Sequence, residues 1–269
     1  MNRAAELQEE VKTAYESYQF LQVYQKVHNF CAFEMGAFYL DILKDRLYTT
    51  GRDSVLRRSA QSAMYHVLEE LVRWIAPILS FTAEEIWQLV PGERADSVFM
   101  STWYEGPSLA DERYDAEFWT RATALVNVVK DAIEPRRANK EIRGSLDAEV
   151  FIAPRNDSAN ELLAAFGDEL RFLLIVSEAT VMDVGEAPED AFRADDFLIW
   201  VRPSDAEKCV RCWHRREDVG SNAEHPELCG RCVANVDGAG EALSSTHNVE
   251  SLPTVLVFSP TGEEQGRIN

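Results

Sequence analysis

The chain has 269 residues, enough for about two domains of roughly 150 residues, which excludes a mini-protein held together only by disulfides or metals. Hydrophobic residues make up 46% and charged residues 27%, as in folded chains rather than disordered ones. The 46 acidic and 27 basic residues give a net charge of −19. Bulk charge therefore excludes a general attraction to nucleic acid or anionic lipid, and any RNA contact must come from local basic patches.

The sequence has the character of a cytoplasmic protein without a membrane span. Unbroken apolar runs such as Phe172–Val176 are far shorter than the ~20 residues of a span, and the first residues, MNRAAELQEE, lack the apolar core of a signal peptide. Apart from Cys31, the cysteines form one tight group: Cys209, Cys212, Cys229 and Cys232. Because an intracellular chain of this size has little need of disulfides, the group indicates a metal site.

Residues 1–144 show helical periodicity almost throughout. The clearest stripe has apolar side chains at three- and four-residue steps: Met64, Val67, Leu68, Leu71, Val72 and Ile75. This helix should begin near residues 53–54 and end or bend at Pro77. The paired carboxylates Glu69 and Glu70 on it are interpreted as solvent-facing.

Two further helices are predicted downstream. The segment FTAEEIWQLV, residues 81–90, should form a short helix that opens on a Thr82–Glu85 capping box and stops at Pro91–Gly92. A second apolar stripe predicts a helix from about Asp115 to Gly144, disturbed by Pro135. About four or five such helices with short joints form a bundle.

The character of the sequence changes at Gly144–Ser145. The segments SLDAEVFIAP, ATVMDV and DFLIWVRP are strand-like and ANELLAAFGDELRFLLI is helical, which predicts a small α+β unit. From 156 to 200, eleven acidic residues stand against two arginines, Arg171 and Arg193, a local charge of −9. That sign is wrong for RNA binding.

We therefore expect a mainly α chain in four parts. These are a helical bundle over 1–144, a small α+β junction subdomain over 145–204, a four-cysteine zinc finger over 205–236 and an unassigned tail over 237–269. Within the tail, LPTVLVFSP could form a last strand.

The cysteine group is the most specific signal in the sequence. CVRC and CGRC are separated by sixteen residues, which fits the spacing of structural zinc sites. Four thiolates at ~2.3 Å close a tetrahedral shell around one Zn²⁺ and leave no position for a catalytic water. Because such a centre carries a charge of about −2, Arg211 and Arg231 are predicted to offset it. Gly230 is expected to adopt a positive φ and aim amides at sulfur.

Other interpretations of the group are two disulfides or four unrelated thiols, which the spacing and the expected compartment disfavour. His214 and His225 could each replace a cysteine, but four thiols already fill the shell, so neither is predicted to be a ligand. The module should unfold on chelation while the helical part survives.

The loop after the first cysteine pair, CWHRR, offers both a stacking face and cations. Trp213 could stack on a base, and Arg215 and Arg216 could hold phosphates. Packing of Trp213 over the zinc knuckle is an equally good interpretation. Charge does not decide between them, because six basic and six acidic residues lie between Arg202 and Cys232.

Two further basic clusters lie on predicted helices, one around Arg46 and one from Lys130 to Arg143. In so acidic a chain they are the best candidates for phosphate contacts, although such runs are more often solvated helix faces. The sequence shows no phosphate-cradling glycine loop, no Ser/His/Asp arrangement and no metalloprotease helix, so no catalytic residues are predicted.

Residues 38–91, from FYLDILKDRLYTTG to AEEIWQLVP, resemble the anticodon-binding domain of class I aminoacyl-tRNA synthetases. STWYEG, AIEPRRANKEIRGSLDAEVFI and CVRCWHRREDVG…CGRCVANV then follow in the order of the bacterial isoleucyl-tRNA synthetases, so the resemblance covers about 1–236. It implies a part in the ATP-dependent attachment of isoleucine to tRNA. The HIGH and KMSKS signatures and the editing domain are absent from these residues. The chain thus resembles a C-terminal fragment without ligase activity of its own, in which ATP belongs only to the parent enzyme.

The resemblance also implies the partners. The bundle and the finger would grip the anticodon arm of isoleucine-specific tRNA, with the catalytic domain of the parent enzyme as the other partner, in a monomeric protein. Splayed bases would be read by stacking and edge hydrogen bonds, while arginine and lysine hold phosphates. The residues that we predict to contact tRNA are Trp213, Arg215, Arg216, Arg46, Arg137, Lys140 and Arg143.

Two other functions stay open from the sequence. A DNA-repair glycosylase has a C-terminal zinc finger with similar cysteine spacing, but MNRAAELQEE lacks the N-terminal proline and following glutamate that such an enzyme needs. A zinc scaffold that binds only protein draws support from the acidic segment 156–200. Excision of damaged bases would identify the first, and absence of tRNA binding at low salt would favour the second.

Overall fold

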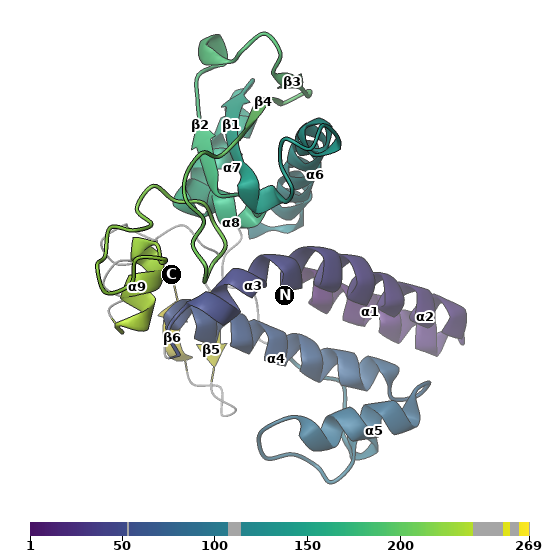
Figure 1. The fold of residues 1–269 in the computed structure, drawn as a ribbon. Helices are drawn as coiled ribbons and strands as arrows, with labels where there is room; N and C mark the ends of the chain where they lie inside the picture. The colour runs from purple at the N-terminus through teal and green to yellow at the C-terminus, as the bar shows by residue number, and fades with distance from the viewer. Residues whose placement is uncertain (53, 107–113, 239–254, 259–263, 269) are drawn as a thin grey trace. The chain divides into compact units, whose positions relative to one another are not determined.

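A computed structural model describes residues 1–52, 54–106, 114–238, 255–258 and 264–268, with side chains up to residue 238 (Figure 1). The chain divides into two compact units. Unit 1 comprises Met1–Leu43, Arg58–Glu112 and Val255–Ile268, and unit 2 comprises Lys44–Arg57, Arg113–Thr254 and Asn269. Within the described ranges, no helix combines the length and the hydropathy needed to cross a membrane.

Unit 1 is largely helical, in keeping with the periodicity of its sequence. Its helices are α1 (Asn2–Glu16), α2 (Phe20–Asn29), a π-helical segment (Phe30–Tyr39), the start of α3 (Leu40–Thr49), most of α4 (Val55–Ile75) and α5 (Ser80–Leu89). Beside these helices, β5 (Val255–Phe258) pairs antiparallel with β6 (Glu264–Ile268). The strand expected within LPTVLVFSP is therefore present.

The helix α4 is buried on two sides. Val67 and Trp74 belong to a core cluster with Leu7 of α1 and other side chains of α1 and α2. Val72 belongs to a second cluster with Trp87 of α5. As the stripe predicts, α4 is amphipathic in part, but its packing leaves little of its surface to solvent.

The observed ends of these helices can be compared with the ends predicted from capping residues and prolines. α4 begins directly after the predicted position and ends two residues before Pro77, as predicted, although Asp53 itself lies outside the described residues. The Thr82–Glu85 capping box is wrong: α5 begins earlier, at Ser80, and its N-cap position makes no side-chain hydrogen bond. Glu84 instead accepts hydrogen bonds from Ser97 Oγ at 2.8 Å and from the Val98 amide at 3.1 Å, which ties down the turn after α5.

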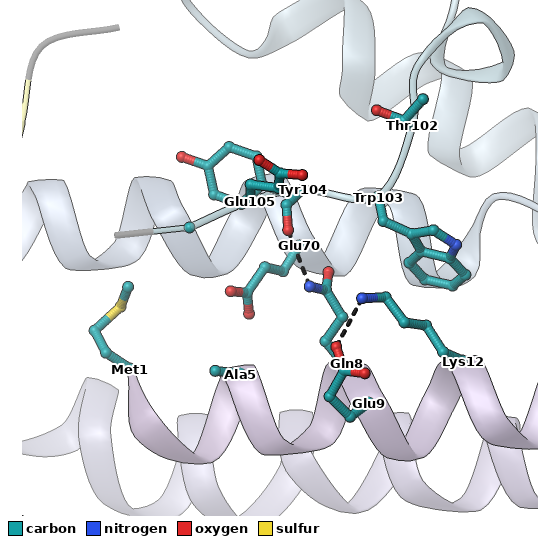
Figure 2. A pocket seen from close by; sticks show the side chains of 11 residues that line it. Met1, Ala5, Gln8, Glu9, Lys12, Glu70, Thr102, Trp103, Tyr104 and Glu105 are labelled. Atoms are coloured by element: carbon teal, nitrogen blue, oxygen red, sulfur yellow. Dashed lines mark hydrogen bonds and ion pairs between the residues drawn. The ribbon is translucent and has the colours of Figure 1, made fainter. Parts of the chain in front are cut away.

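The interpretation of Glu69 and Glu70 as solvent-facing is also wrong, because each is only 3% exposed. Glu69 accepts hydrogen bonds from Arg73 at 2.6 Å and from Arg94 at 3.0 Å. Glu70 Oε2 has no hydrogen-bond partner in the described part of the chain. Its side chain lines a cavity of about 580 Å³ between α1 and the segment 102–106 (Figure 2).

Unit 2 contains a four-stranded sheet in the order β2-β1-β4-β3. Its strands are β1 (Ala148–Pro154), β2 (Glu178–Val181), β3 (Phe192–Arg193) and β4 (Phe197–Pro203). β1 runs parallel to β2 and antiparallel to β4, and β3 pairs antiparallel with β4. The helices of this unit beyond α3 and α4 are α6 (Ala116–Ala138), α7 (Asp157–Phe166), α8 (Leu170–Leu174) and α9 (Gly230–Val236). α6, α7 and α8 each contact the sheet (Figure 1).

The alternation that predicts β1 and β4 also determines how their sheet is buried. Val150 opposes Val201 across the two strands and both are buried. On the other face, Phe151 opposes Trp200 with ring centroids 5.1 Å apart, and Arg202 lies over Phe151. The predicted small α+β unit is thus confirmed.

The helix predicted from Asp115 to Gly144 is shorter than expected. Asp115 caps it by accepting a hydrogen bond from the Phe118 amide at 2.8 Å, as an N-cap aspartate should. The helix ends at Ala138, three residues after Pro135, and Lys140 adopts a left-handed conformation with φ of 62°. The left-handed conformation of Lys140 is incompatible with a continuing helix, so the last predicted turns of the helix, up to Gly144, do not form.

Burial raises the pKa of Glu70 to about 7, although the α-ammonium of Met1 and Lys12 oppose the shift. Between the ordinary value of 4.5 and about 7, the folded chain therefore keeps a proton that the unfolded chain releases. The protonated carboxyl contributes stability that is fully present below pH 4.5 and is lost as the pH rises through 7.

We predict that Glu70→Gln stabilises the chain at pH 8 by roughly 2–3 kcal/mol, because glutamine places no charge in this interior. The gain should shrink to about 1 kcal/mol or less at pH 5, where the wild-type carboxyl is largely neutral when folded. Chemical unfolding at both pH values measures it. Glu69→Gln is the matched control and should destabilise the chain, since it breaks the pairs with Arg73 and Arg94. An equal gain at pH 5 and pH 8 would contradict the raised pKa.

Candidate metal centre and nucleic-acid interface

The four grouped cysteines converge in unit 2. Cys209 and Cys212 lie in the loop that follows β4, Cys229 precedes α9, and Cys232 lies in the first turn of α9. Their four sulfur atoms all lie within 4.8 Å of one another, and all four residues are buried. Within the described residues, this is the group of histidine, cysteine and acidic side chains that could hold a metal ion.

The electrostatics of the cluster favour a bound cation. Hydrogen bonds with Cys212 and Cys232 lower the pKa of Cys229, while those with Cys212 and Cys229 raise the pKa of Cys232. Sulfur atoms this close compete for protons and cannot all carry charge unless a cation lies between them. Four thiols with no other ligand type form the donor set of a closed, structural zinc site. All four would bind the ion, and the filled tetrahedral shell would have no position for substrate.

Gly230 does not play the role expected for it. Its φ is not positive, and its amide donates a hydrogen bond to Asp218 Oδ2 at 2.9 Å rather than to sulfur. A Cβ atom there would lie 2.8 Å from the same carboxylate oxygen, so close packing explains the glycine. The amide of Cys229 donates to Cys209 Sγ at 3.4 Å, and positive φ values in this module belong to Trp213, at 67°, and Gly220, at 87°.

The arginines of the two cysteine pairs have different surroundings. Arg231 donates two hydrogen bonds to the Asp45 carboxylate, at 2.5 and 2.8 Å. Although burial opposes the shift, Asp45 and the Cys212 thiol raise the pKa of Arg231. Burial opposes ionisation of Asp45, but Arg231 outweighs burial and holds the pKa of Asp45 below its ordinary value. Arg211 instead donates to the carbonyl of Cys232 at 3.4 Å. Arg231 is therefore the side chain placed to offset thiolate charge.

Neither histidine between the cysteine pairs joins the sulfur cluster. His214 is buried, and its ring lies 5.6 Å from that of Phe172. His225 Nε2 lies 3.6 Å from Asp237 Oδ1. Both positions agree with the prediction that cysteines alone form the donor set.

The three finger residues predicted to contact tRNA are not equally free. Trp213 is 61% exposed, and the ammonium of Lys208 lies 5.9 Å from its ring, so the indole is not packed away over the knuckle. Arg215 bonds Asp147 at 2.9 Å and the Ala206 carbonyl at 3.0 Å. Arg216 pairs with Glu178.

The four predicted residues on and after the helices also differ. Arg46 pairs with Glu169 at 2.9 Å, and Arg137 pairs with Glu134 at 3.0 Å. Lys140 and Arg143 are exposed, and their side chains make no ion pair in the part of the chain that the structure describes. Of the predicted residues, three can therefore contact a ligand without breaking an ion pair of the described chain: Trp213, Lys140 and Arg143.

Sequence reasoning missed two residues next to the cluster, Asp45 and Phe172. Asp45 is 186 positions from Arg231, and the ring of Phe172 lies 5.0 Å from the Arg231 guanidinium. Their local sequence carries no signal of this, because each looks like an ordinary helix residue. Only the pairing of distant segments brings them to the zinc module.

Comparison with known proteins assigns the class. The family described as "Anticodon-binding domain of tRNA ligase" matches residues 1–152, more than half of the chain. The chain belongs to this family of anticodon-binding domains. The family described as "Zinc finger found in FPG and IleRS" matches residues 206–235, which include all four grouped cysteines. This match and the convergence of the sulfur atoms support one structural zinc ion.

The relatives narrow the assignment to one kind of tRNA ligase. The chain is 50% identical over 244 residues to the isoleucine–tRNA ligase of Teredinibacter turnerae, 54% identical over 245 to that of Azotobacter vinelandii and 52% identical over 246 to that of Alcanivorax borkumensis. Each alignment covers 90% of this chain but only 26% of the relative. The chain thus spans about a quarter of the length of these ligases and is similar to their anticodon-binding and zinc-finger part.

These findings also weigh the alternatives. Taken by itself, the zinc-finger match is compatible with the glycosylase interpretation, because the family includes the FPG type. The anticodon-binding match and the isoleucine–tRNA ligases favour the tRNA interpretation over it. The expected resemblance to bacterial isoleucyl-tRNA synthetases is confirmed.

We predict that the purified chain holds one zinc ion and that Cys212→Ser lowers both its zinc content and its zinc affinity. Structural zinc sites of this kind are worth about 10 to 16 kcal/mol near neutral pH, so chelation should unfold the module. Fluorescence of Trp213 should change on chelation while most far-ultraviolet helical signal persists. Cys31→Ser is the matched control and should keep the metal, since Cys31 is exposed and outside the cluster. Equal metal content in the two variants would contradict the site.

Proposed function

We propose that this chain binds the anticodon arm of isoleucine-specific tRNA and positions it for ATP-dependent attachment of isoleucine by a catalytic domain not contained in these 269 residues. The observation that carries the proposal is the presence, in one chain, of an anticodon-binding domain and the zinc finger of the isoleucine–tRNA ligases. The parent protein would be a ligase, and this part its tRNA handle.

The chemistry of the described residues supports a local RNA contact rather than bulk attraction. Trp213 offers an exposed ring to a splayed base, and such stacking tolerates any base because every base has a π-face. Lys140 and Arg143 offer exposed cations without ion-pair partners in the described ranges. Arg215 and Arg216 would have to exchange a carboxylate for a phosphate, which reduces the gain from each contact.

We predict salt-dependent binding of an isoleucine-specific tRNA transcript, with Trp213→Ala weakening it by about tenfold because one stacked base loses its platform. Trp213→Phe is the matched control and should retain most of the affinity. Lys140→Gln and Arg143→Gln should each lower the salt slope by ~0.7 to 0.9, the contribution of one neutralised phosphate. Filter binding across a salt series measures both. No detectable binding at low salt would overturn the proposal and favour a protein-binding scaffold.

We also propose that the chain by itself makes no isoleucyl-adenylate, because no phosphate-cradling glycine loop or class I signature occurs in it. Isoleucine-dependent pyrophosphate exchange measures this. Exchange above background in a preparation free of contaminating ligase would contradict the proposal.

A further inference from the structure

Unit 2 gathers arginine side chains around Phe172, and most of them are paired. Arg171 lies 4.6 Å and Arg231 5.0 Å from the centre of the Phe172 ring. Four arginines of this region face three carboxylates, and each carboxylate already holds one arginine: Arg46 with Glu169, Arg216 with Glu178, and Arg231 with Asp45. Arg171 pairs with none of these three carboxylates.

Arg171 is fixed in place but not neutralised. Its guanidinium makes a cation–π contact with the Phe172 ring, and the side chain is partly exposed. In the described part of the chain it makes no ion pair and no side-chain hydrogen bond. Burial, followed by the charges of Arg216 and Arg231, lowers the pKa of Arg171, although the carboxylates of Glu178 and Asp45 oppose the shift.

A role for Arg171 as the counter-ion of the zinc centre is not supported. The hydrogen bond with Cys229 opposes the lowering of the Cys212 pKa, and the charge of Arg231 is one of the causes that lower it. Arg171 is not among the main causes that shift the pKa of Cys212, Cys229 or Cys232. The positive charge of Arg171 is therefore available to an anion from outside the chain.

We propose that Arg171 binds a phosphodiester of the RNA backbone. This inference rests on the proposed function and adds a residue to the seven predicted from sequence. A planar guanidinium matches two phosphate oxygens. Because Arg171 pairs with no carboxylate among the described residues, it gains the phosphate contact without breaking one of their ion pairs.

The acidic segment provides a matched control. Arg171 and Arg193 are the two arginines between residues 156 and 200. Arg193 is exposed on β3 and, within the described ranges, forms no ion pair. Arg171→Gln and Arg193→Gln therefore remove the same charge from the same acidic surroundings, but only the first removes it from the Phe172 cluster.

The test is binding of an isoleucine-specific tRNA transcript to wild type, Arg171→Gln, Arg171→Lys and Arg193→Gln across a salt series, with zinc content measured in each. We expect Arg171→Gln to lose roughly fivefold in affinity and to reduce the salt slope by about one, while Arg193→Gln changes neither. Arg171→Lys should restore the slope but not the full affinity, since lysine keeps the charge and loses the fork. Zinc content should be the same in all four proteins.

Other outcomes separate the failures. If the wild type binds tRNA and Arg171→Gln leaves the slope unchanged, or if both glutamine variants reduce it equally, the inference is wrong while the proposed function stands. A structural role for Arg171 would give a different pattern. Arg171→Gln would then lose zinc and Arg171→Lys would keep it, while the salt slope would be unchanged in the lysine variant and in the glutamine variant once it is loaded with zinc. If the wild type does not bind tRNA, the proposed function fails, and this inference fails with it.

Discussion

Within unit 2, the buried ion pair between Asp45 and Arg231 joins α3 to the zinc module. Asp45 lies in the part of α3 that belongs to this unit, and Arg231 lies between the two cysteines of the second pair. Both side chains are largely buried, so each would cost several kcal/mol to leave uncompensated. The Cys212 thiol also raises the pKa of Arg231, so the same guanidinium interacts with a carboxylate of α3 and with a cysteine of the sulfur cluster.

In so acidic a chain, any contact with RNA has to rely on a few cations that have no carboxylate partner. A net charge of −19 repels phosphate at long range, so the contacts must be few and local. Most arginines of unit 2 that we predicted to bind phosphate form ion pairs with carboxylates of the same unit. What is left are exposed or unpaired groups, namely Trp213, Lys140, Arg143 and Arg171.

The sequence predicts those features that are local or that repeat at short spacing. The apolar stripe of α4, the alternation of β1 and the cysteine spacing all involve residues close in the chain, and the structure contains the corresponding helix, strand and sulfur cluster. The failures arise where a second segment decides the outcome. Glu69 and Glu70 lie off the apolar stripe, yet packing on both sides of α4 buries them. Gly230 is small because Asp218 approaches it, which spacing alone does not reveal.

The candidate site shows the same division. Its sulfur ligands are predictable because thiolates need a fixed spacing to surround one ion. Whether an arginine is free depends on partners such as Glu169, Glu178 and Asp45, and the last of these is 186 positions from its arginine. Basic residues can therefore be counted from sequence, but their availability can be known only from the fold.

A double-mutant cycle with Asp45→Asn and Arg231→Gln tests most directly whether this ion pair supports the zinc module. Zinc affinity and unfolding free energy would be measured for the wild type, both single variants and the double variant. The structure predicts that each single change weakens the module and that the two effects are coupled by about 1–3 kcal/mol, because either change strands the other buried charge. Effects that add within about 0.5 kcal/mol, with zinc affinity unchanged, would contradict this account.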